Sequence, residues 1–356
     1  MSSFDSICKM AKEYNIMVSG SAHSLYPMDT YYGLLWYNND EAIEIPKRYP
    51  YKGEWGGCLS TCIMLRDKYP MPCKLSVVWL SLVEQKFYAI EEKLPARALA
   101  ELWDRHSHYN YSHIIVGMAP YGNIALWFYG ERKSTLLAWM YGTEVSIDMG
   151  DFLPENPSKS LVEYCDSYVK SDLRVKENLV RNGIPPHDLF DNYMKQFTYR
   201  YLLMFEQWND NKREWLKYEE DELAPELDYI EEALFDGTHD KLHDGELMNY
   251  HQAGKPKKLA MKWHIKKSEY TAYFWFGEDE IQTLFDRFYG AHPETKTDFM
   301  IRIDSEKKKI ELALYRYGLK EPQVISESAY QLLAFKNKFE YYRSDNYNQA
   351  KGAWIW

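Results

Sequence analysis

The chain has 356 residues, and its 43 Lys and Arg against 53 Asp and Glu give a formal net charge of −10. This length suggests two domains, and a composition with 46% hydrophobic and 27% charged residues excludes long disordered stretches. The acidic balance argues against nucleic acid as the main partner, because phosphate binding requires concentrated Lys and Arg. The 31 Tyr, 12 Trp and 15 Phe favour strands and interfaces.

The five cysteines are too few, and odd in number, for a disulfide scaffold. Cys58 and Cys62 have no second Cys or His pair at zinc spacing, so we expect reduced thiols and no metal site. Residues 1–20 lack the apolar run of a signal peptide, and no window is apolar enough to span a membrane. We therefore expect a cytoplasmic protein that holds no cofactor.

In chain order, residues 28–64 come first, where alternation broken by Pro and Gly predicts edge strands and loops. A first module begins with strand-like residues 75–79, and apolar residues at helical spacing predict a helix over 94–105. Two further strands are predicted over 113–118 and 124–130, joined by a Pro-Tyr-Gly-Asn turn. The predicted order is strand, strand, helix, strand, strand.

Residues 158–218 follow this module and are predicted to be helical. Periodic Leu, Tyr and Phe occur over 160–170 and again over 188–208, and Pro185 and Pro186 separate the two stretches. Asp188 is a plausible N-cap for the second of these helices.

An acidic run extends from Glu214 to Glu246. It contains thirteen acids and only Lys217 and Lys241 as bases, a net charge of −11, so it accounts for the whole excess of the chain. One interpretation is a solvated linker. The other is a docking surface for a basic partner, since such a patch speeds encounter and adds specificity. The candidate partner-binding residues are Glu219, Glu220, Asp221, Glu222, Asp228, Glu231 and Glu232.

The order of the first module recurs near the C-terminus. Residues 259–263 keep the Leu and Trp spacing of 75–79, and the helix predicted over 276–287 ends, like 94–105, in Leu, an aromatic residue, Asp and Arg. Two strands are predicted after it, over 299–303 and 310–318. Chance recurrence in an aromatic-rich chain is the alternative, but the shared order favours duplication.

The predicted fold class is therefore α+β, with two related antiparallel-sheet-plus-helix units in tandem. The predicted domains are 1–213, an acidic linker at 214–254, and a degenerate second copy at 255–356.

Candidate chemistry is weak throughout the sequence. His239 and His243 have the spacing of a zinc-protease helix, but Asp240 stands where a Glu is needed and glycines flank the stretch, which favours an acidic loop. His106, His108 and His113 have no counterparts in the second copy, and we interpret them as incidental. Nucleotide-binding and nucleophile-elbow motifs are absent from the sequence. The aromatic stretches 270–276 and 341–347 are interpreted as sheet faces or an interface.

Several of these segments, taken together, resemble a known family. Residues 79–88, the Gly-Met-Ala-Pro-x-Gly-x-Ile-x-Leu-Trp element within 114–130, and residues 183–201 are similar to the bacterial family catalogued as domain of unknown function 2931. The resemblance covers about residues 30–210, and 255–320 resemble a degenerate copy. Members are often predicted lipoproteins, whereas we expect this chain, in which we find no such signal or lipobox, not to share their envelope location.

The resemblance implies a location beside genes for secreted toxins of type VI or contact-dependent systems, and hence an immunity role. We therefore expect a non-catalytic protein that binds and occludes a basic protein toxin. The alternatives are a hydrolase-like enzyme with an unrecognised site and a structural, envelope-associated protein.

Overall fold

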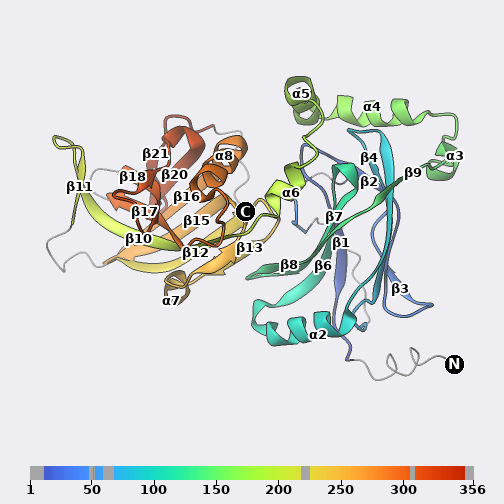
Figure 1. The fold of residues 1–356 in the computed structure, drawn as a ribbon, viewed down its shortest axis with the longest axis horizontal. Coiled ribbons are helices and arrows are strands. Elements are labelled where there is room, and N and C mark those ends of the chain that lie inside the picture. The colour runs from blue at the N-terminus through green and yellow to red at the C-terminus, as the bar shows by residue number, and fades with distance from the viewer. Residues whose placement is uncertain are drawn as a thin grey trace. The chain divides into compact units, whose positions relative to one another are not determined.

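The computed structural model describes residues 12–47, 51, 53–58, 68–217, 225–304 and 309–348. The chain divides into two compact units (Figure 1). Unit 1 is Met1–Asn192 with Asp236–Thr238, and unit 2 is Tyr193–Phe235 with His239–Trp356. The division therefore lies twenty-one residues before the boundary expected at 213. Among the residues described, no helix is long and apolar enough to cross a membrane.

Unit 1 contains two sheets of four and five strands. The first has the order β1 (Met17–Ser21), β6 (Tyr111–Met118), β7 (Asn123–Gly130), β8 (Ser134–Tyr141), with β1 parallel to β6. The second is antiparallel, in the order β3 (Ala42–Glu44), β2 (Met28–Trp36), β4 (Lys74–Ser81), β5 (Lys86–Lys93), β9 (Thr143–Val145). Helix α2 (Ala96–Arg105) connects β5 to β6 and packs Trp103 against Phe128.

Unit 2 also contains two sheets. One has the order β11 (Glu214–Lys217), β10 (Phe197–Asn209), β17 (Thr297–Asp304), β18 (Lys309–Arg316), β19 (Gln323–Val324), with β14 (His251–Ala253) also paired to β10. The other has the order β13 (His239–Leu242), β12 (Glu226–Leu234), β15 (Pro256–Ile265), β16 (Ser268–Phe276), β20 (Tyr330–Lys336), β21 (Phe339–Arg343). Helix α8 (Glu278–Tyr289) connects β16 to β17, and a short helix, α7 (Asp244–Leu247), follows β13.

The two units share one strand order. The predicted strand, strand, helix, strand, strand module is β4–β5–α2–β6–β7 in unit 1 and β15–β16–α8–β17–β18 in unit 2. The correspondence extends beyond it: β1 is parallel to β6 as β10 is to β17, and β2 lies between β3 and β4 as β12 lies between β13 and β15. The α+β prediction with repeated sheet units is confirmed, and the acidic run that was expected to be a linker contributes strands to unit 2.

A β-bulge marks the same position in both units. In β2 the register shifts between Thr30, which pairs with Trp79, and Tyr32; in β12 it shifts between Leu227, which pairs with Trp263, and Tyr229. Trp79 lies opposite Tyr88 and Trp263 opposite Tyr270, and both indoles are fully buried. Bulges persist within families because they set strand twist, so this shared irregularity supports duplication of the entire unit.

In unit 1, helices cover part of the outer face of the five-stranded sheet. They are α3 (Met149–Phe152) and α4 (Leu161–Ser171), which α5 (Leu173–Asn182) and α6 (Leu189–Tyr193) follow. Phe152, Tyr164 and Cys165 pack against Leu80 and Phe87 in one buried cluster. The Tyr164 hydroxyl donates to the buried carboxylate of Asp29 at 2.5 Å, so the cover supplies a hydrogen bond to a carboxylate that is shielded from solvent. Helix α4 begins with a capping box between Ser160 and Glu163.

The matching positions of unit 2 are polar instead. Through the bulge and the Trp–Tyr pairs, the counterparts of Tyr31, Leu80 and Phe87 are Asp228, His264 and Glu269. His264 Nδ1 lies 3.0 Å from Asp228, and Lys262 Nζ lies 2.8 Å from Glu269. Charged pairs on this face tolerate water, whereas the apolar residues of unit 1 require a cover.

The helix expected over 188–208 is wrong for most of its length. Only α6 is helical there, and residues from Phe197 onward form β10. Phe197 and Tyr201 are four residues apart, which mimics a helical stripe, but Tyr199 lies between them on the same strand face. Seven residue pairs with β17 then establish the strand.

Burial of Cys165 predicts its reactivity. Desolvation raises the pKa of the Cys165 thiol to about 12, and the thiolate is the reactive form. We expect iodoacetamide at pH 8 to modify half-buried Cys73 in the folded protein and to leave Cys165 unmodified, as peptide mapping by mass spectrometry would show. In urea both should react alike, and equal labelling rates in the native state would show that α4 does not cover the sheet.

Candidate functional site

Of the acidic residues predicted to bind a partner, the three that the structure describes do not share one face. Glu219, Glu220, Asp221 and Glu222 lie outside the described residues. Asp228 pairs with His264, and Glu231 Oε1 accepts a hydrogen bond from Lys241 Nζ at 2.6 Å. Glu232 points to the opposite face of β12 and is only 1% exposed, so it does not belong to a docking surface in this conformation.

His239 and His243 do not share a helix. His239 begins β13, and His243 is the N-cap of α7, with its Nδ1 3.1 Å from the carbonyl oxygen of Asp228. Four residues of strand span about 13 Å, which removes the helical spacing that a zinc-protease motif requires. Within the part of the chain that the structure describes, no group of three His, Cys, Asp or Glu residues could hold a metal ion.

His106 and His108 lie around the end of α2 and His113 lies in β6. The His106 ring stacks on Tyr109 at 5.1 Å. Desolvation lowers the pKa of both His106 and His113. Their contacts are local and do not assemble a reactive group.

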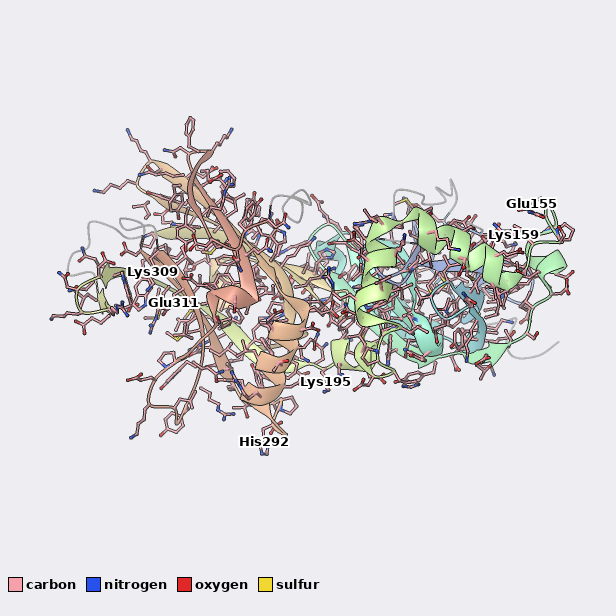
Figure 2. All side chains as sticks on the ribbon, turned by 90° about the horizontal axis from the view of Figure 1, so that it is seen from above. Glu155, Lys159, Lys195, His292, Lys309 and Glu311 are labelled. Atoms are coloured by element: carbon pink, nitrogen blue, oxygen red, sulfur yellow. The ribbon has the colours of Figure 1, made fainter. Side chains whose placement is uncertain are left out.

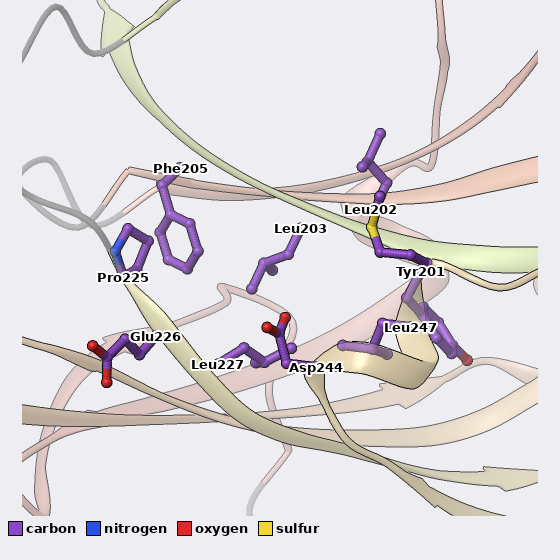
Figure 3. Close-up of a pocket in the computed structure, with 10 residues that line it drawn as sticks. Tyr201, Leu202, Leu203, Phe205, Pro225, Glu226, Leu227, Asp244 and Leu247 are labelled. Atoms are coloured by element: carbon purple, nitrogen blue, oxygen red, sulfur yellow. The ribbon is translucent and has the colours of Figure 1, made fainter. Parts of the chain in front are cut away.

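A pocket opens in unit 2 between β10, β12 and α7 (Figure 3). Its volume is about 510 Å³, within the range of ligand sites. Alternate residues of β10, namely Tyr201, Leu203 and Phe205, line one wall, because side chains two apart share a strand face. The remaining lining residues are Leu202, Pro225, Glu226, Leu227, Asp244, Leu247 and Met248.

Two carboxylates border this pocket. Glu226 and Asp244 are exposed, and neither side chain forms a hydrogen bond or an ion pair with any residue that the structure describes. The other described acids of the segment are paired or capped: Asp236 accepts from Thr238, and Glu246 accepts from the backbone of His243. In the described part of the acidic run, the two carboxylates at this pocket are therefore free to pair with a cation from another molecule.

A buried polar cluster lies behind the pocket wall. The Tyr201 hydroxyl donates to Glu232 at 2.5 Å, and His251 Nε2 lies 3.6 Å from the other oxygen of that carboxylate. The Tyr199 hydroxyl donates to the carbonyl of Gly254 at 3.0 Å. Burial, and then the charge of Glu232, raise the pKa of Tyr201 well above its usual range. The cluster therefore keeps Tyr201 protonated as a donor to Glu232.

Aromatic side chains also gather on the outer face of the sheet of unit 2 that contains β16 and β20. Tyr273 stacks with Trp275 at 6.0 Å between ring centres, Phe335 lies 6.2 Å from Tyr273, and Tyr347 lies 5.9 Å from Trp275. The Arg343 guanidinium lies 5.2 Å from the ring of Tyr347. We call Tyr273, Trp275, Phe335, Arg343 and Tyr347 the aromatic face. Four of them are half-buried and Arg343 is exposed.

A second aromatic cluster lies where the acidic segment begins. Trp208 of β10 pairs with Trp215 of β11, and Lys309 Nζ lies 3.0 Å from the Trp208 ring centre. The Trp215 indole donates to Glu311 at 2.9 Å, and Lys309 Nζ lies 3.9 Å from the same carboxylate (Figure 2). Because Lys309 already lies over the Trp208 ring, we treat this cluster as structural.

The Ala-Pro-x-Gly turn that carries the family resemblance is held by Glu84. Its carboxylate accepts from the backbone N–H of Tyr121 at 2.9 Å and from the Tyr88 hydroxyl at 2.8 Å. Tyr121 and Gly122 both have positive φ, and a Cβ at Gly122 would lie 2.5 Å from the carbonyl oxygen of Gly142. The turn therefore fixes the β6–β7 connection rather than offering a reactive group.

Comparison with known proteins places only the first unit. Residues 10–185 match the model of the family described as "Protein of unknown function (DUF2931)", which confirms the resemblance inferred from the sequence. The match ends before unit 2, whose relation to unit 1 rests on the shared strand order. Neither the curated proteins nor the solved structures contain a match to this chain.

Glu84→Ala tests the structural role of the turn. It removes the acceptor of two partly buried donors, and we expect the free energy of unfolding to fall by about 1–3 kcal/mol. Urea denaturation gives the measurement, with Glu92→Ala, an exposed acid on β5, as the control. An unchanged midpoint for Glu84→Ala would contradict this role.

Tyr201→Phe tests the buried cluster through pH. In the unfolded chain a tyrosine ionises near pH 10, whereas folded Tyr201 stays protonated there because its pKa is raised. Above pH 10 the folded state therefore holds the extra proton, and stability falls as pH rises, by at most about 1.4 kcal/mol per pH unit for one group.

We expect Tyr201→Phe to be less stable at pH 7, since Glu232 loses a donor, and to lose less stability above pH 10 than the unaltered protein. Thermal unfolding from pH 7 to 11 measures both effects. Tyr317→Phe, at a side chain that is fully exposed, is the control and should reproduce the original profile. Parallel profiles for all three proteins would refute the assignment.

Proposed function

Starting from a first unit that belongs to the DUF2931 family, we propose that this chain is a non-catalytic binding protein. Its target is a cognate secreted antibacterial toxin of a type VI or contact-dependent system, which it neutralises by direct occlusion. The choice of a toxin follows from the genomic setting that the family resemblance implies. The proposal places the complex in the cytoplasm of the protected bacterium.

The observation that carries the binding role is the aromatic face of unit 2. Trp, Tyr and Arg are the residues that most often dominate the energy of protein interfaces, and this face presents all three together. Their rings are already held by one another and by the sheet. Binding a partner therefore costs these side chains little conformational entropy. Unit 2 therefore offers a preorganised surface.

The charge of the segment supports a basic target. Glu226 and Asp244 are exposed without partners among the described residues, and opposite charge on a partner would accelerate encounter. Occlusion requires one immunity protein per toxin and no turnover, because the bound surface covers the toxin's own site. Protection should then follow the dissociation rate of the complex.

Co-expression tests the proposal directly. The chain, carrying an affinity tag, is produced with the product of each neighbouring gene, and we expect one of these to be retained in a 1:1 complex. Expression of that product alone should arrest growth, and co-expression of the chain should restore it. If deletion of the chain leaves cells fully resistant to every neighbouring product, the proposal fails.

Trp275→Ala tests the aromatic face. Removing a central interface Trp costs about 2 kcal/mol or more, so we expect affinity for the retained partner to fall at least about thirtyfold. Phe339→Ala is the matched control, because Phe339 is also aromatic, lies in the same sheet and is 79% exposed. Isothermal titration calorimetry measures both, and an unchanged affinity for Trp275→Ala would exclude this face.

A further inference from the structure

We propose that the pocket between β10 and β12 receives an extended segment of the protein partner. The segment inserts an aromatic side chain between the two sheets of unit 2 and places a Lys or Arg side chain at Glu226 and Asp244. This inference rests on the proposed function, because it names the part of a partner that this pocket accepts.

Unit 1 shows what fits between two such strands of facing sheets. Its own chain crosses from β2 toward β1: Tyr51 exchanges both backbone hydrogen bonds with Met28, at 2.7 and 3.1 Å, and Gly53 forms a parallel bridge with His23. Tyr51 is fully buried, and a Cβ at Gly20 of β1 would overlap its ring. An extended segment with an aromatic anchor therefore fills this gap in unit 1.

The pocket of unit 2 occupies the matching place. β1 and β2 correspond to β10 and β12, and the shared bulge aligns Met28 with Pro225, two residues before the residue that pairs with the buried Trp. Pro225 and three alternate residues of β10 line the pocket. Where unit 1 holds Tyr51, the described part of unit 2 leaves a volume of about 510 Å³ (Figure 3).

The walls specify the chemistry of the occupant. Leu203, Phe205, Leu227 and Leu247 present apolar surface, which favours an aromatic or large aliphatic side chain. Asp244 rises beside this surface from α7, and Glu226 lies next to Pro225 (Figure 3). A cationic side chain that follows the anchor gains two carboxylates that have no other partner among the described residues.

Pro225 removes one backbone hydrogen bond from the docking of such a segment, which favours reversible binding. Met28 both donates to and accepts from Tyr51, whereas proline has no N–H to donate. A segment docked beside Pro225 lacks that backbone hydrogen bond. Its affinity therefore depends more on the aromatic anchor and on Glu226 and Asp244 than is usual when a peptide adds a strand to a sheet.

The test uses the full chain and fluorescein-labelled synthetic nonapeptides. In the first peptide Lys alternates with Tyr and Trp; in the second Glu replaces Lys; in the third Ser replaces the aromatic residues. Fluorescence anisotropy gives each dissociation constant. We expect the first peptide to bind at least about tenfold more tightly than either other peptide, and equal affinities for all three would overturn the inference.

Two pocket variants locate the binding. Glu226→Gln combined with Asp244→Asn should weaken the Lys peptide about three- to tenfold and reduce its dependence on salt, while Glu321→Gln, an exposed acid elsewhere in unit 2, should have no effect. Leu203→Trp should weaken the Lys peptide by filling the pocket. Circular dichroism and thermal unfolding confirm that each variant folds.

The outcomes separate this inference from the proposed function. A neighbouring product that is retained equally by the original chain and by both pocket variants supports the immunity role and overturns the pocket inference. Peptide binding that both pocket variants weaken, without any protective partner, supports the pocket and overturns the immunity role. Peptide binding that neither variant weakens also overturns the pocket inference.

Discussion

The space between β1 and β2 in unit 1, and between β10 and β12 in unit 2, is the constraint that shapes both units. Apolar side chains from two faces meet there, and leaving them in water costs about 25 cal/mol for each Å² exposed. Unit 1 meets this constraint with Tyr51, which its own chain places between β1 and β2. Unit 2 has Pro225 at the matching backbone position, and its described residues leave a pocket. The shared strand order is therefore closed at this place in unit 1, and open at it among the described residues of unit 2.

The outer faces of the two units also differ in whether the chain covers them. Unit 1 covers Leu80 and Phe87 with α3 and α4, and Tyr164 satisfies the buried Asp29. Unit 2 carries Asp228, His264 and Glu269 at the positions of Tyr31, Leu80 and Phe87, and these charged residues pair with one another or with Lys262. An apolar face needs a permanent cover, whereas a polar one remains stable in water. Unit 1 is thus the more self-contained copy, and unit 2 the copy with exposed, organised side chains.

The sequence allowed the repeated core to be predicted, because buried positions such as Trp79 and Trp263 tolerate few replacements and remain similar in both copies. It did not allow the assignment of β10, since Phe197, Tyr201 and Phe205 fit a helical and an alternating pattern equally, and only pairing with β17 decides between them. Charge counting found the acidic segment but could not separate Glu232, which faces inward, from Glu231, which pairs with Lys241. The pocket was missed because β10, β12 and α7 meet only in three dimensions.

The turn held by Glu84 has a consequence for how relatives are recognised. Its Pro, Gly and positive φ values serve the connection between two strands, so the motif is a requirement of the scaffold and not of a binding site. Proteins that share the motif are therefore expected to share this connection, and under the proposed function each would bind its own target elsewhere on the molecule. Target preference would then have to be sought in the least alike portions of such sequences, and the motif itself would carry no information about it.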